Sequence, residues 1–507
     1  MWKRKKSSLF FAALFLITLA LRLCHSGLLW ADEDYHLAAA IQTLHGKLLY
    51  RDIWYDKPPL SALVYAAIGA PSGWLLRLFD AVYVLAVCVA IARLARALWG
   101  EREAYIAAAA LAFFLSFDLP ASIIPIAPDF FMMLPHILAV YCAWRARPFA
   151  AGVWCGVAFL FNTKAVFALA ACSFLTWRAL PLLAAGFVAP NLIALAGWRN
   201  YFDQVWRWGL AYAKSPIAEH PVLNALRRTL DWLGFHAALV IGAAYVAWKE
   251  RNRATLFLAI WAALSLMAVL SGLRVFPRYF LQLLPVAVLA FSRGATVLFS
   301  PGSTGASHVG QAVSPANPRR RRAVALTAIT LAALIPLIRF APRYILLALH
   351  GPANWRDASL DLDSREAAAW LNQHKHAGDT LQVWGYRPDI YVYTRLPYAS
   401  RFGDSQPLTG VPADRHLTDA RPLVPAWAAR NRQELITATP TFIVDGLGPM
   451  NPRLAITRYP DLSAWLAQYQ PVHRTALAVI YEIRVPSAGP AASTLRTYGR
   501  RNRTSSD

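Results

Sequence analysis

Long apolar runs separated by short basic clusters fill the first two thirds of the chain. The runs that can cross a bilayer as helices lie near residues 8–30, 75–98, 103–119, 129–144, 180–197, 236–248, 254–273, 279–299 and 323–340. A transmembrane helix needs about 20 predominantly apolar residues. The pattern therefore predicts a polytopic α-helical membrane domain over residues 1–340.

The apolar stretch 149–177 is interrupted by the polar turn Asn162-Thr163-Lys164, and it fits either one long helix or two short ones. With two helices, every short basic loop falls on the side of the basic N-terminus, whereas one helix puts the last two clusters on the other side. The clusters are Arg93/Arg96/Arg102, Arg145/Arg147, Lys249/Arg251/Arg253 and Arg319 to Arg322. We therefore predict two helices here, about 11 transmembrane helices in all, and a cytoplasmic N-terminus.

Two outer loops carry helical patterns of their own. In the first outer loop, 31–60, four apolar side chains share one helical face: Leu37, Ile41, Leu44 and Leu48. This spacing predicts a helix that lies along the membrane surface. The second outer loop, 198–235, is long, basic and rich in Trp. We expect an interfacial amphipathic helix there, with contacts to anionic lipid phosphates as a second interpretation.

Residues 341–490 have a mixed polar composition that predicts a small α/β domain on the outer, periplasmic side. Helical patterns cover 364–374, 430–437 and 462–469, and strand-like runs cover 381–384, 441–444 and 477–485. The last residues, 491–507, are rich in Arg, Ser and Thr without an apolar period, so we expect a disordered basic tail.

The composition strengthens the membrane interpretation. Of the 507 residues, 57% are hydrophobic, and the mean hydropathy is +0.36, which is more apolar surface than a soluble fold of this size buries. The formal net charge of +23 would suggest nucleic acid as the partner of a soluble protein. Here much of that charge lies in the loop clusters, where it acts as a topology signal. We therefore expect membrane lipids, and no nucleic acid, as partners.

Polar residues that are costly at membrane depth gather on one side of the predicted helices. Asp32, Asp56, Asp129, Lys164 and Arg278 all fall at the outer ends of the spans. A charged side chain in the bilayer costs roughly 2.5–3.5 kcal/mol, so such residues normally line a cavity. The simpler interpretation of any one acid is solvation just outside the membrane, and Asp129 also fits an acid placed at a helix N-terminus.

The order of these motifs resembles that of the type C glycosyltransferases. The sequence is most similar to the superfamily of protein O-mannosyltransferases and lipid A aminoarabinose transferases, over nearly the whole chain. The matching segments are Asp32-Glu33, Asp56-Lys57-Pro58-Pro59, Pro128-Asp129, the Lys164 turn, Phe276 to Pro285, Val383-Trp384-Gly385 and Pro388-Asp389-Ile390-Tyr391. The family motif usually has Glu where this chain has Asp56.

The resemblance implies an enzyme that moves a sugar from a polyprenyl-phosphate carrier to an acceptor hydroxyl, with inversion. Asp32 matches the catalytic aspartate and would act as general base, while Asp34 fits the N-cap of the following helix better. Glu33 would orient the acceptor or tune the pKa of Asp32. Lys57, Lys164 and Arg278 would bind the donor phosphate. Three further residues would line the cavity: Tyr35, Asp129 and Tyr279.

Some members of the family use a divalent metal ion. Asp56 and Asp129 form the acidic pair that would hold it here, and oxygen-only ligands favour Mg or Mn. The expected site of action is the periplasmic face of the bacterial inner membrane. The acceptor would be an envelope lipid, a polysaccharide or a protein. A flippase for lipid-linked sugars and an inactive membrane scaffold are the competing hypotheses.

Overall fold

The computed structural model describes residues 2–192, 198–215, 217–299, 318–353, 355 and 358–484. The tail expected at 491–507 lies outside the described residues. The chain divides into two compact units. The helical unit comprises residues 1–365 and 388–395, and the C-terminal unit comprises residues 366–387 and 396–507.

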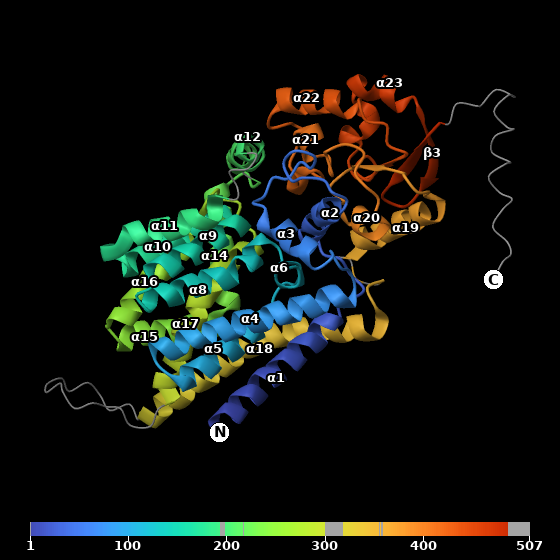
Figure 1. Cartoon of the computed structure of the whole chain (residues 1–507). Helices are drawn as coiled ribbons and strands as arrows, with labels where there is room; N and C mark the ends of the chain where they lie inside the picture. Colours follow the sequence, from blue (N-terminus) through green and yellow to red (C-terminus); the bar gives the residue numbers. More distant parts are fainter. Residues whose placement is uncertain are drawn as a thin grey trace, which may run out of the picture. The chain divides into compact units, whose positions relative to one another are not determined.

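The helical unit contains the apolar helices that the hydropathy pattern predicts. Their bounds are α1 (Trp2–Leu23), α4 (Trp74–Leu98), α5 (Glu101–Phe114), α8 (Met133–Trp144), α9 (Pro148–Phe161), α10 (Val166–Leu175), α11 (Leu180–Asn191), α15 (Ala237–Lys249), α16 (Arg253–Leu270), α17 (Leu284–Phe299) and α18 (Pro318–His350). Helix α4 packs against both α1 and α5, and α15 packs against α17 (Figure 1). The polytopic helical architecture is confirmed.

Within the described residues, four helices are long and apolar enough to cross a membrane alone: Lys6–Leu23, Trp74–Leu98, Arg253–Leu270 and Leu326–His350. Two bent helix pairs bring the number to six if each pair is one span. Other predicted spans form shorter helices of 10 to 16 residues. Each of these helices is shorter than the roughly 20 residues of a full membrane crossing, so a test of length alone identifies fewer spans than there are apolar helices.

The polar turn Asn162-Thr163-Lys164 separates α9 from α10, so the two-helix interpretation of 149–177 is confirmed. The Asn162 side chain accepts a hydrogen bond from the backbone N–H of Lys164 at 3.0 Å. This side-chain cap satisfies a donor at the start of the short 3₁₀ turn η1 (Thr163–Ala165). The chain thereby turns, and Lys164 is left at the junction of two helices.

Helices α9 and α11 pack with their backbones in contact. A Cβ atom added at Gly152 would lie 2.1 Å from the carbonyl oxygen of Leu183, and one at Gly186 would lie 2.1 Å from that of Phe149. Small residues permit this close approach between membrane helices. Any larger side chain at either glycine would force the two helices apart.

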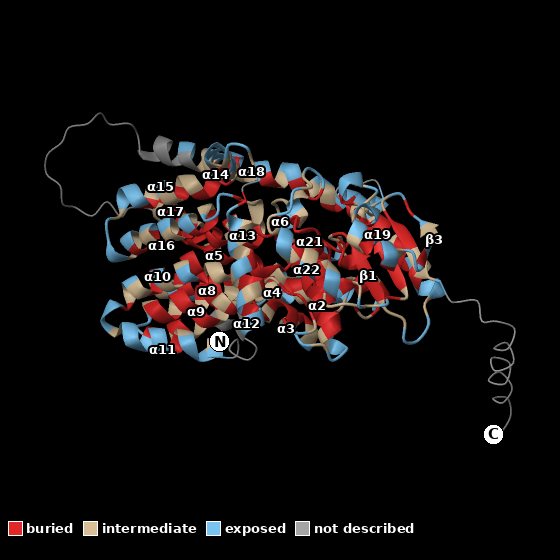
Figure 2. Ribbon diagram, turned by 90° about the horizontal axis from the view of Figure 1, so that it is seen from above, coloured by how far each residue is buried: buried red, intermediate tan, exposed pale blue. Residues whose placement is uncertain are grey.

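Large apolar side chains lie exposed on the outer surfaces of the helical unit, which suits contact with lipid. Examples are Leu9, Leu182, Leu226, Ile338 and Leu349, each more than half exposed. Figure 2 shows exposed positions along α11 and α15, with buried positions on the sides that face other helices.

The first outer loop forms α2 (Glu33–Leu44) and α3 (Leu60–Ala67), which pack against each other. Every residue of α2 from Glu33 to Gln42 is buried. The helix is therefore enclosed by protein on all sides and does not lie along a surface with one apolar face, because α3 and α20 (Asp389–Thr394) cover it. Leu48 lies beyond the end of α2.

The second outer loop contains α12 (Trp198–Tyr201), a π-helical turn (Phe202–Arg207), α13 (Trp208–Ala213) and α14 (Pro221–Phe235). Helix α14 is amphipathic, with exposed Val222, Leu223 and Leu230, and it bends by 86° into α15. The amphipathic character agrees with the expectation for this loop, and a position of α14 along the membrane surface stays a prediction.

The C-terminal unit is built on a four-stranded mixed sheet in the order β1-β2-β4-β3. The strands are β1 (Leu381–Trp384), β2 (Phe442–Asp445), β3 (Tyr469–Arg474) and β4 (Val479–Ile483). β1 and β2 are parallel and wholly buried, and the other two pairings are antiparallel. Helices α21 (Gln406–Thr409) and α22 (Pro425–Leu435) pack against each other. The unit also contains the short helix α23 (Ser463–Leu466) and the second half of α19 (Ser359–His374), which begins in the helical unit. The predicted α/β character is confirmed, although β3 was not foreseen.

Candidate active site

Asp32 lies at the tight turn that joins the first span to α2. Its φ of 78° places it in the left-handed region, which is uncommon for any residue but glycine and is best tolerated by Asp and Asn. Helix α2 begins at Glu33, two residues before the start at Tyr35 that an Asp34 cap requires, so the N-cap position falls on Asp32 and not on Asp34. Asp34 accepts a hydrogen bond from the Tyr35 N–H at 2.7 Å. Asp32 makes no capping bond, and its carboxylate pairs with Arg278.

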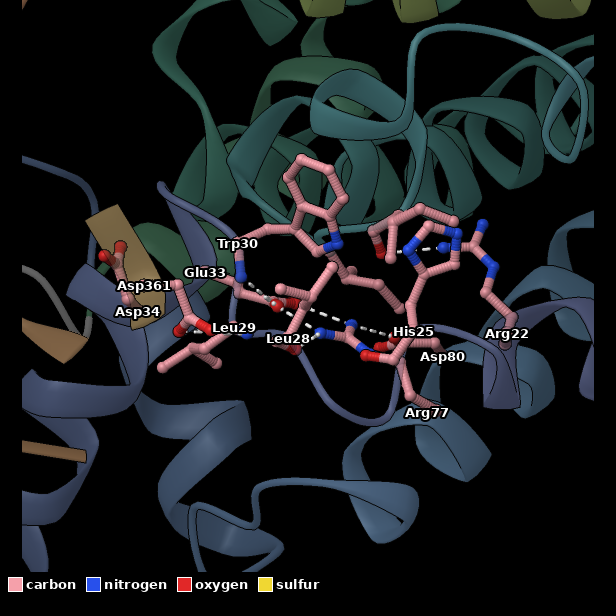
Figure 3. Close-up of polar contacts among 12 residues, drawn as sticks. Arg22, His25, Leu28, Leu29, Trp30, Glu33, Asp34, Arg77, Asp80 and Asp361 are labelled. Atoms are coloured by element: carbon pink, nitrogen blue, oxygen red, sulfur yellow. Dashed lines mark hydrogen bonds and ion pairs between the residues drawn. The ribbon is translucent and has the colours of Figure 1, made fainter. Parts of the chain in front are cut away.

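Glu33 points into a fully buried cluster (Figure 3). Its carboxylate accepts hydrogen bonds from the Arg77 guanidinium at 2.5 and 3.0 Å, and from the Trp30 N–H at 2.9 Å. Arg77 also donates to Asp80 at 2.6 Å and to the Leu28 carbonyl at 2.9 Å. A buried pair of this kind is costly to break. The cluster therefore fixes the backbone that presents Asp32.

Lys57 and Asp56 form an ion pair of 2.9 Å, with the Lys57 side chain 42% exposed and Asp56 almost buried. Their backbones are also held. The Asp56 N–H donates to the Tyr35 hydroxyl at 3.2 Å, and the Tyr50 hydroxyl donates to the Lys57 carbonyl at 2.8 Å. The prolines that follow exclude Lys57 from a helix. The ammonium is therefore accessible on a backbone that is fixed.

Gln204 of the second outer loop supports the same segment. Its side-chain oxygen accepts from the Tyr55 N–H at 2.8 Å, and its amide donates to the Tyr50 carbonyl at 2.7 Å. Nearby, His36 Nδ1 lies 2.6 Å from the Tyr55 hydroxyl. Burial, with the charge of Lys57, lowers the pKa of His36 to about 3. The ring is therefore neutral near pH 7 and adds no charge beside Lys57.

Asp129 is buried at the start of the short helix α7 (Pro128–Phe131). One carboxylate oxygen accepts from the Asn162 side-chain amide at 3.0 Å and from the Gln282 amide at 3.3 Å. Lys164 and Lys57 are both close enough to interact with its charge. The negative charge of Asp129 thus acts on two of the predicted phosphate-binding lysines.

Lys164 has an unusual environment for an ammonium group. Its Nζ lies 3.0 Å from the centroid of the Tyr279 ring, which is a cation–π arrangement. The same atom is buried and has no hydrogen-bond acceptor among the described residues. A buried charge without an acceptor is costly, so this group is well suited to receive an anionic ligand.

The 3₁₀ turn η5 (Pro277–Gln282) brings three of these contacts together. Arg278 reaches the first outer loop, Tyr279 reaches the η1 turn, and Gln282 reaches the start of α7. Sequence reasoning identified Arg278 and Tyr279 but missed Gln282 as a site residue. Its position in the same short turn, four residues after Arg278, is the signal that could have found it.

The structure thus brings together most of the predicted site residues. Asp32 pairs with Arg278, and both Lys164 and Lys57 lie in range of the charge of Asp129. Tyr35 is buried and stacks on Tyr55 with a centroid distance of 5.3 Å. Tyr279 covers Lys164, and Glu33 belongs to the separate Arg77 cluster.

The predicted metal pair, Asp56 and Asp129, has nitrogen partners. Asp56 is paired with Lys57, and Asp129 accepts from the amides of Asn162 and Gln282. In the described part of the chain, no group of three or more His, Cys, Asp and Glu side chains could hold a metal ion. Mg and Mn require several oxygen ligands. One oxygen of Asp56, Oδ1, is buried without a hydrogen-bond partner among the described residues, so a divalent metal ion at this pair stays a prediction.

Comparisons with known proteins identify the fold. No family model matches the chain, and no curated protein matches it. The crystal structure of ArnT from Cupriavidus metallidurans bound to undecaprenyl phosphate is similar over 96% of this chain and 99% of that one, with 15% identity and a TM-score of 0.58. Its apo state gives 17% identity, coverages of 94% and 98%, and the same TM-score.

The archaeal oligosaccharyltransferase AglB from Archaeoglobus fulgidus, in complex with an inhibitory peptide and a dolichol-phosphate, is also similar. The likeness covers 96% of this chain and 76% of that one, with 13% identity and a TM-score of 0.50. The chain therefore has the fold of the type C glycosyltransferases, as the sequence motifs predicted.

Proposed function

We propose that this chain is a glycosyltransferase that moves a hexosyl or pentosyl group from a polyprenyl-phosphate carrier to an acceptor hydroxyl, with inversion. One observation carries the proposal: a carboxylate held in a strained turn, Asp32, pairs with Arg278 on the short turn that also contacts Lys164 and Asp129. The likeness in fold to ArnT bound to undecaprenyl phosphate supports a polyprenyl-phosphate donor.

Asp32 is the general base in this proposal. It takes the proton of the acceptor hydroxyl while the acceptor oxygen forms a bond to the anomeric carbon. The bond between that carbon and the phosphate oxygen breaks on the opposite face, and its electron pair leaves with the phosphate. The acceptor proton ends on Asp32, and the products are a glycosylated acceptor and a polyprenyl phosphate.

The departing phosphate gains a negative charge, because a phosphodiester becomes a monoester. Lys57, Lys164 and Arg278 would stabilise that developing charge, which is the contribution that cationic groups make in a site shielded from water. Among the described residues, the Lys164 ammonium has no hydrogen-bond acceptor to give up when phosphate binds. Arg278 would turn from Asp32 to the phosphate, so that donor binding releases the base.

Glu33 is a positioning residue in this proposal. Its carboxylate is occupied by Arg77 and the Trp30 N–H, so it would act on catalysis by fixing the turn at Asp32. Asp56 would hold Lys57 in the same way. Asp129 would balance the charge of Lys164 when no donor is bound.

We place the reaction at the periplasmic face of the bacterial inner membrane, with the N-terminus in the cytoplasm and residues 341–490 as a periplasmic domain. The positive-inside pattern of the loops supports this orientation. The donor lipid would enter sideways from the bilayer, and the acceptor would be an envelope lipid, a polysaccharide or a protein.

The test is donor consumption by the purified chain in detergent. Radiolabelled polyprenyl-phosphate sugars are supplied singly with an envelope extract as acceptor source, and the wild type is compared with Asp32→Asn. We expect label in the extract and free polyprenyl phosphate from the wild type alone. Equal consumption by both proteins would refute the role of Asp32.

A second outcome would favour the flippase hypothesis. The chain is reconstituted in proteoliposomes, and transbilayer movement of the same labelled lipids is measured. Movement of donor lipid without consumption of any donor would overturn the transferase proposal, whereas consumption without movement supports it.

A further inference from the structure

The C-terminal unit contains a cavity of about 250 Å³ beside α22, apart from all the residues discussed so far. Its apolar wall includes Ala428 and Leu454, and its polar wall is formed by three arginines and Tyr459. The arginines are Arg432, Arg453 and Arg458. No sequence motif singled out this group of residues.

Arg432 is the fixed member of the three. Its Nε donates to the carboxylate of Asp461 at 2.8 Å, and Nη1 donates to the Leu408 carbonyl at 2.7 Å. Its guanidinium also lies 4.6 Å from the centroid of the Tyr459 ring. These contacts hold one edge of the guanidinium group, and Nη2 makes no hydrogen bond within the described ranges.

Arg453 and Arg458 are exposed at the cavity. Arg453 donates to the Thr418 carbonyl at 3.2 Å. The Arg458 side chain makes no hydrogen bond or ion pair with any residue that the structure describes. Asp461 is the single carboxylate paired with the three arginines in the described chain. The cavity therefore carries an excess of positive charge.

Tyr459 adds a neutral hydrogen-bond donor to this charge. Burial raises the pKa of Tyr459 to about 12, so the hydroxyl keeps its proton at neutral pH. Its ring is fixed by Trp384, with a centroid distance of 5.1 Å. The cavity thus offers guanidinium donors for an oxyanion and a hydroxyl for a polar group nearby.

We propose that this cavity binds a sugar that carries a carboxylate or a phosphate. Arginine forks match the geometry of both oxyanions. The volume is below the roughly 300–1,000 Å³ of sites for drug-sized ligands, which suits one ring with its charged substituent. The site goes beyond the proposed transfer reaction, and its occupancy can be measured whether or not the chain transfers sugar.

The test is isothermal titration of the full chain in detergent with four probes: glucuronate, glucose 6-phosphate, glucose and inorganic phosphate. We expect a charged sugar to bind, glucose not to bind, and inorganic phosphate to bind at least tenfold more weakly. The preferred charged sugar distinguishes a carboxylate ligand from a phosphate ligand. Arg458→Gln and Arg453→Gln should each weaken binding roughly tenfold, because each removes a charged hydrogen bond.

Arg430→Gln is the matched control. Arg430 is exposed on α22 two residues before Arg432, but it does not line the cavity. Binding in this variant should equal that of the wild type. Equal weakening in Arg430→Gln and Arg458→Gln would show nonspecific charge attraction and overturn the proposal. Equal affinity for glucose and both charged sugars would also overturn it, and so would binding of inorganic phosphate as tight as that of glucose 6-phosphate.

Chemical protection supplies a second readout. Phenylglyoxal modifies accessible guanidinium groups, and mass spectrometry locates the adducts. The charged sugar that binds should protect Arg453 and Arg458 while Arg430 is modified at its usual rate. Modification of all three at unchanged rates, at a sugar concentration that saturates the titration, would refute the assignment of the site to this cavity.

Discussion

The guanidinium of Arg278 is paired with the carboxylate of Asp32, so a residue proposed to bind the donor phosphate also neutralises the proposed base. Both side chains are about one quarter exposed. The pair lies where the η5 turn meets the turn before α2. In the proposed mechanism this arrangement links two events, because the base is released only when a phosphate takes over its partner.

Replacement of Asp32 by Asn tests the base directly. Because the amide cannot accept the acceptor proton, we expect turnover to fall by at least about 100-fold. The melting temperature should stay close to that of the wild type, since Asp32 makes no capping bond. Turnover with labelled donor and thermal unfolding are measured together. Asp203→Asn, at an exposed position paired with Arg207, should leave both unchanged.

Arg278 can be tested by loss and by retention of its charge. Arg278→Gln should raise the KM for the donor roughly tenfold, because a charged hydrogen bond to phosphate is lost. Arg278→Lys keeps the positive charge, so its KM for the donor should lie between those of the wild type and of Arg278→Gln. The KM is measured with labelled donor at saturating acceptor. An unchanged donor KM in Arg278→Gln would remove Arg278 from the phosphate site.

Glu33 should behave differently from its neighbour Asp32. Glu33→Gln leaves the buried Arg77 with one carboxylate partner instead of two, and breaking such a pair costs about 3–5 kcal/mol. We expect a clear fall in the denaturant midpoint or melting temperature of Glu33→Gln. A variant as stable as the wild type that has lost turnover would instead place Glu33 in contact with substrate.

Lys164 should control the binding of polyprenyl phosphate. Undecaprenyl phosphate is expected to raise the melting temperature of the wild type, since a ligand at 100 times its Kd adds about 2.7 kcal/mol. Lys164→Met keeps the length of the side chain without the ammonium, and it should lose at least half of this stabilisation. Lys249→Met, at the end of α15, is the control. An equal rise in melting temperature in the wild type and both variants would contradict the role of Lys164 in binding the phosphate.

The stability of the chain should depend on pH through Asp34. Burial first, and then the nearby carboxylates of Asp389, Glu33 and Asp361, raise the pKa of Asp34 well above its ordinary value of 3.8. The folded state therefore holds this proton more tightly than the unfolded state, and the stabilisation is lost as the pH rises through the raised value.

Asp34→Asn removes that dependence and retains an oxygen for the Tyr35 N–H. The variant should gain in melting temperature over the wild type as the pH rises from about 4.5 to about 8.5, by about 2 °C or more at the upper end. The measurement is thermal unfolding across this range. A difference that shrinks with rising pH would show that Asp34 is ionised in the fold.

Much of the helical unit follows from simple patterning. The polar turn at Asn162 interrupts an apolar run, and the structure ends α9 there. The burial of α2 did not follow from the sequence, because its apolar face at Leu37 and Ile41 suits a membrane surface as well as a protein interior. What covers α2 is α20, which is more than 300 residues away in the chain.

The partners of the site residues were harder to foresee than the residues themselves. Arg77 and Asp80 lie inside a predicted span, and their spacing of three residues indicates a pair within one helix. Nothing local indicates that Glu33 completes the group, because that contact joins residues 44 positions apart. Gln204 and Gln282 also act through long-range contacts, which one sequence does not reveal.

The contact between α9 and α11 has a consequence for how a lipid could reach Lys164. Where Gly152 and Gly186 bring the two backbones together, no gap remains that is as wide as a hydrocarbon chain. This seam is closed to an isoprenoid tail. A polyprenyl carrier that approaches Lys164 from the bilayer must therefore take a portal on another side of the helical unit.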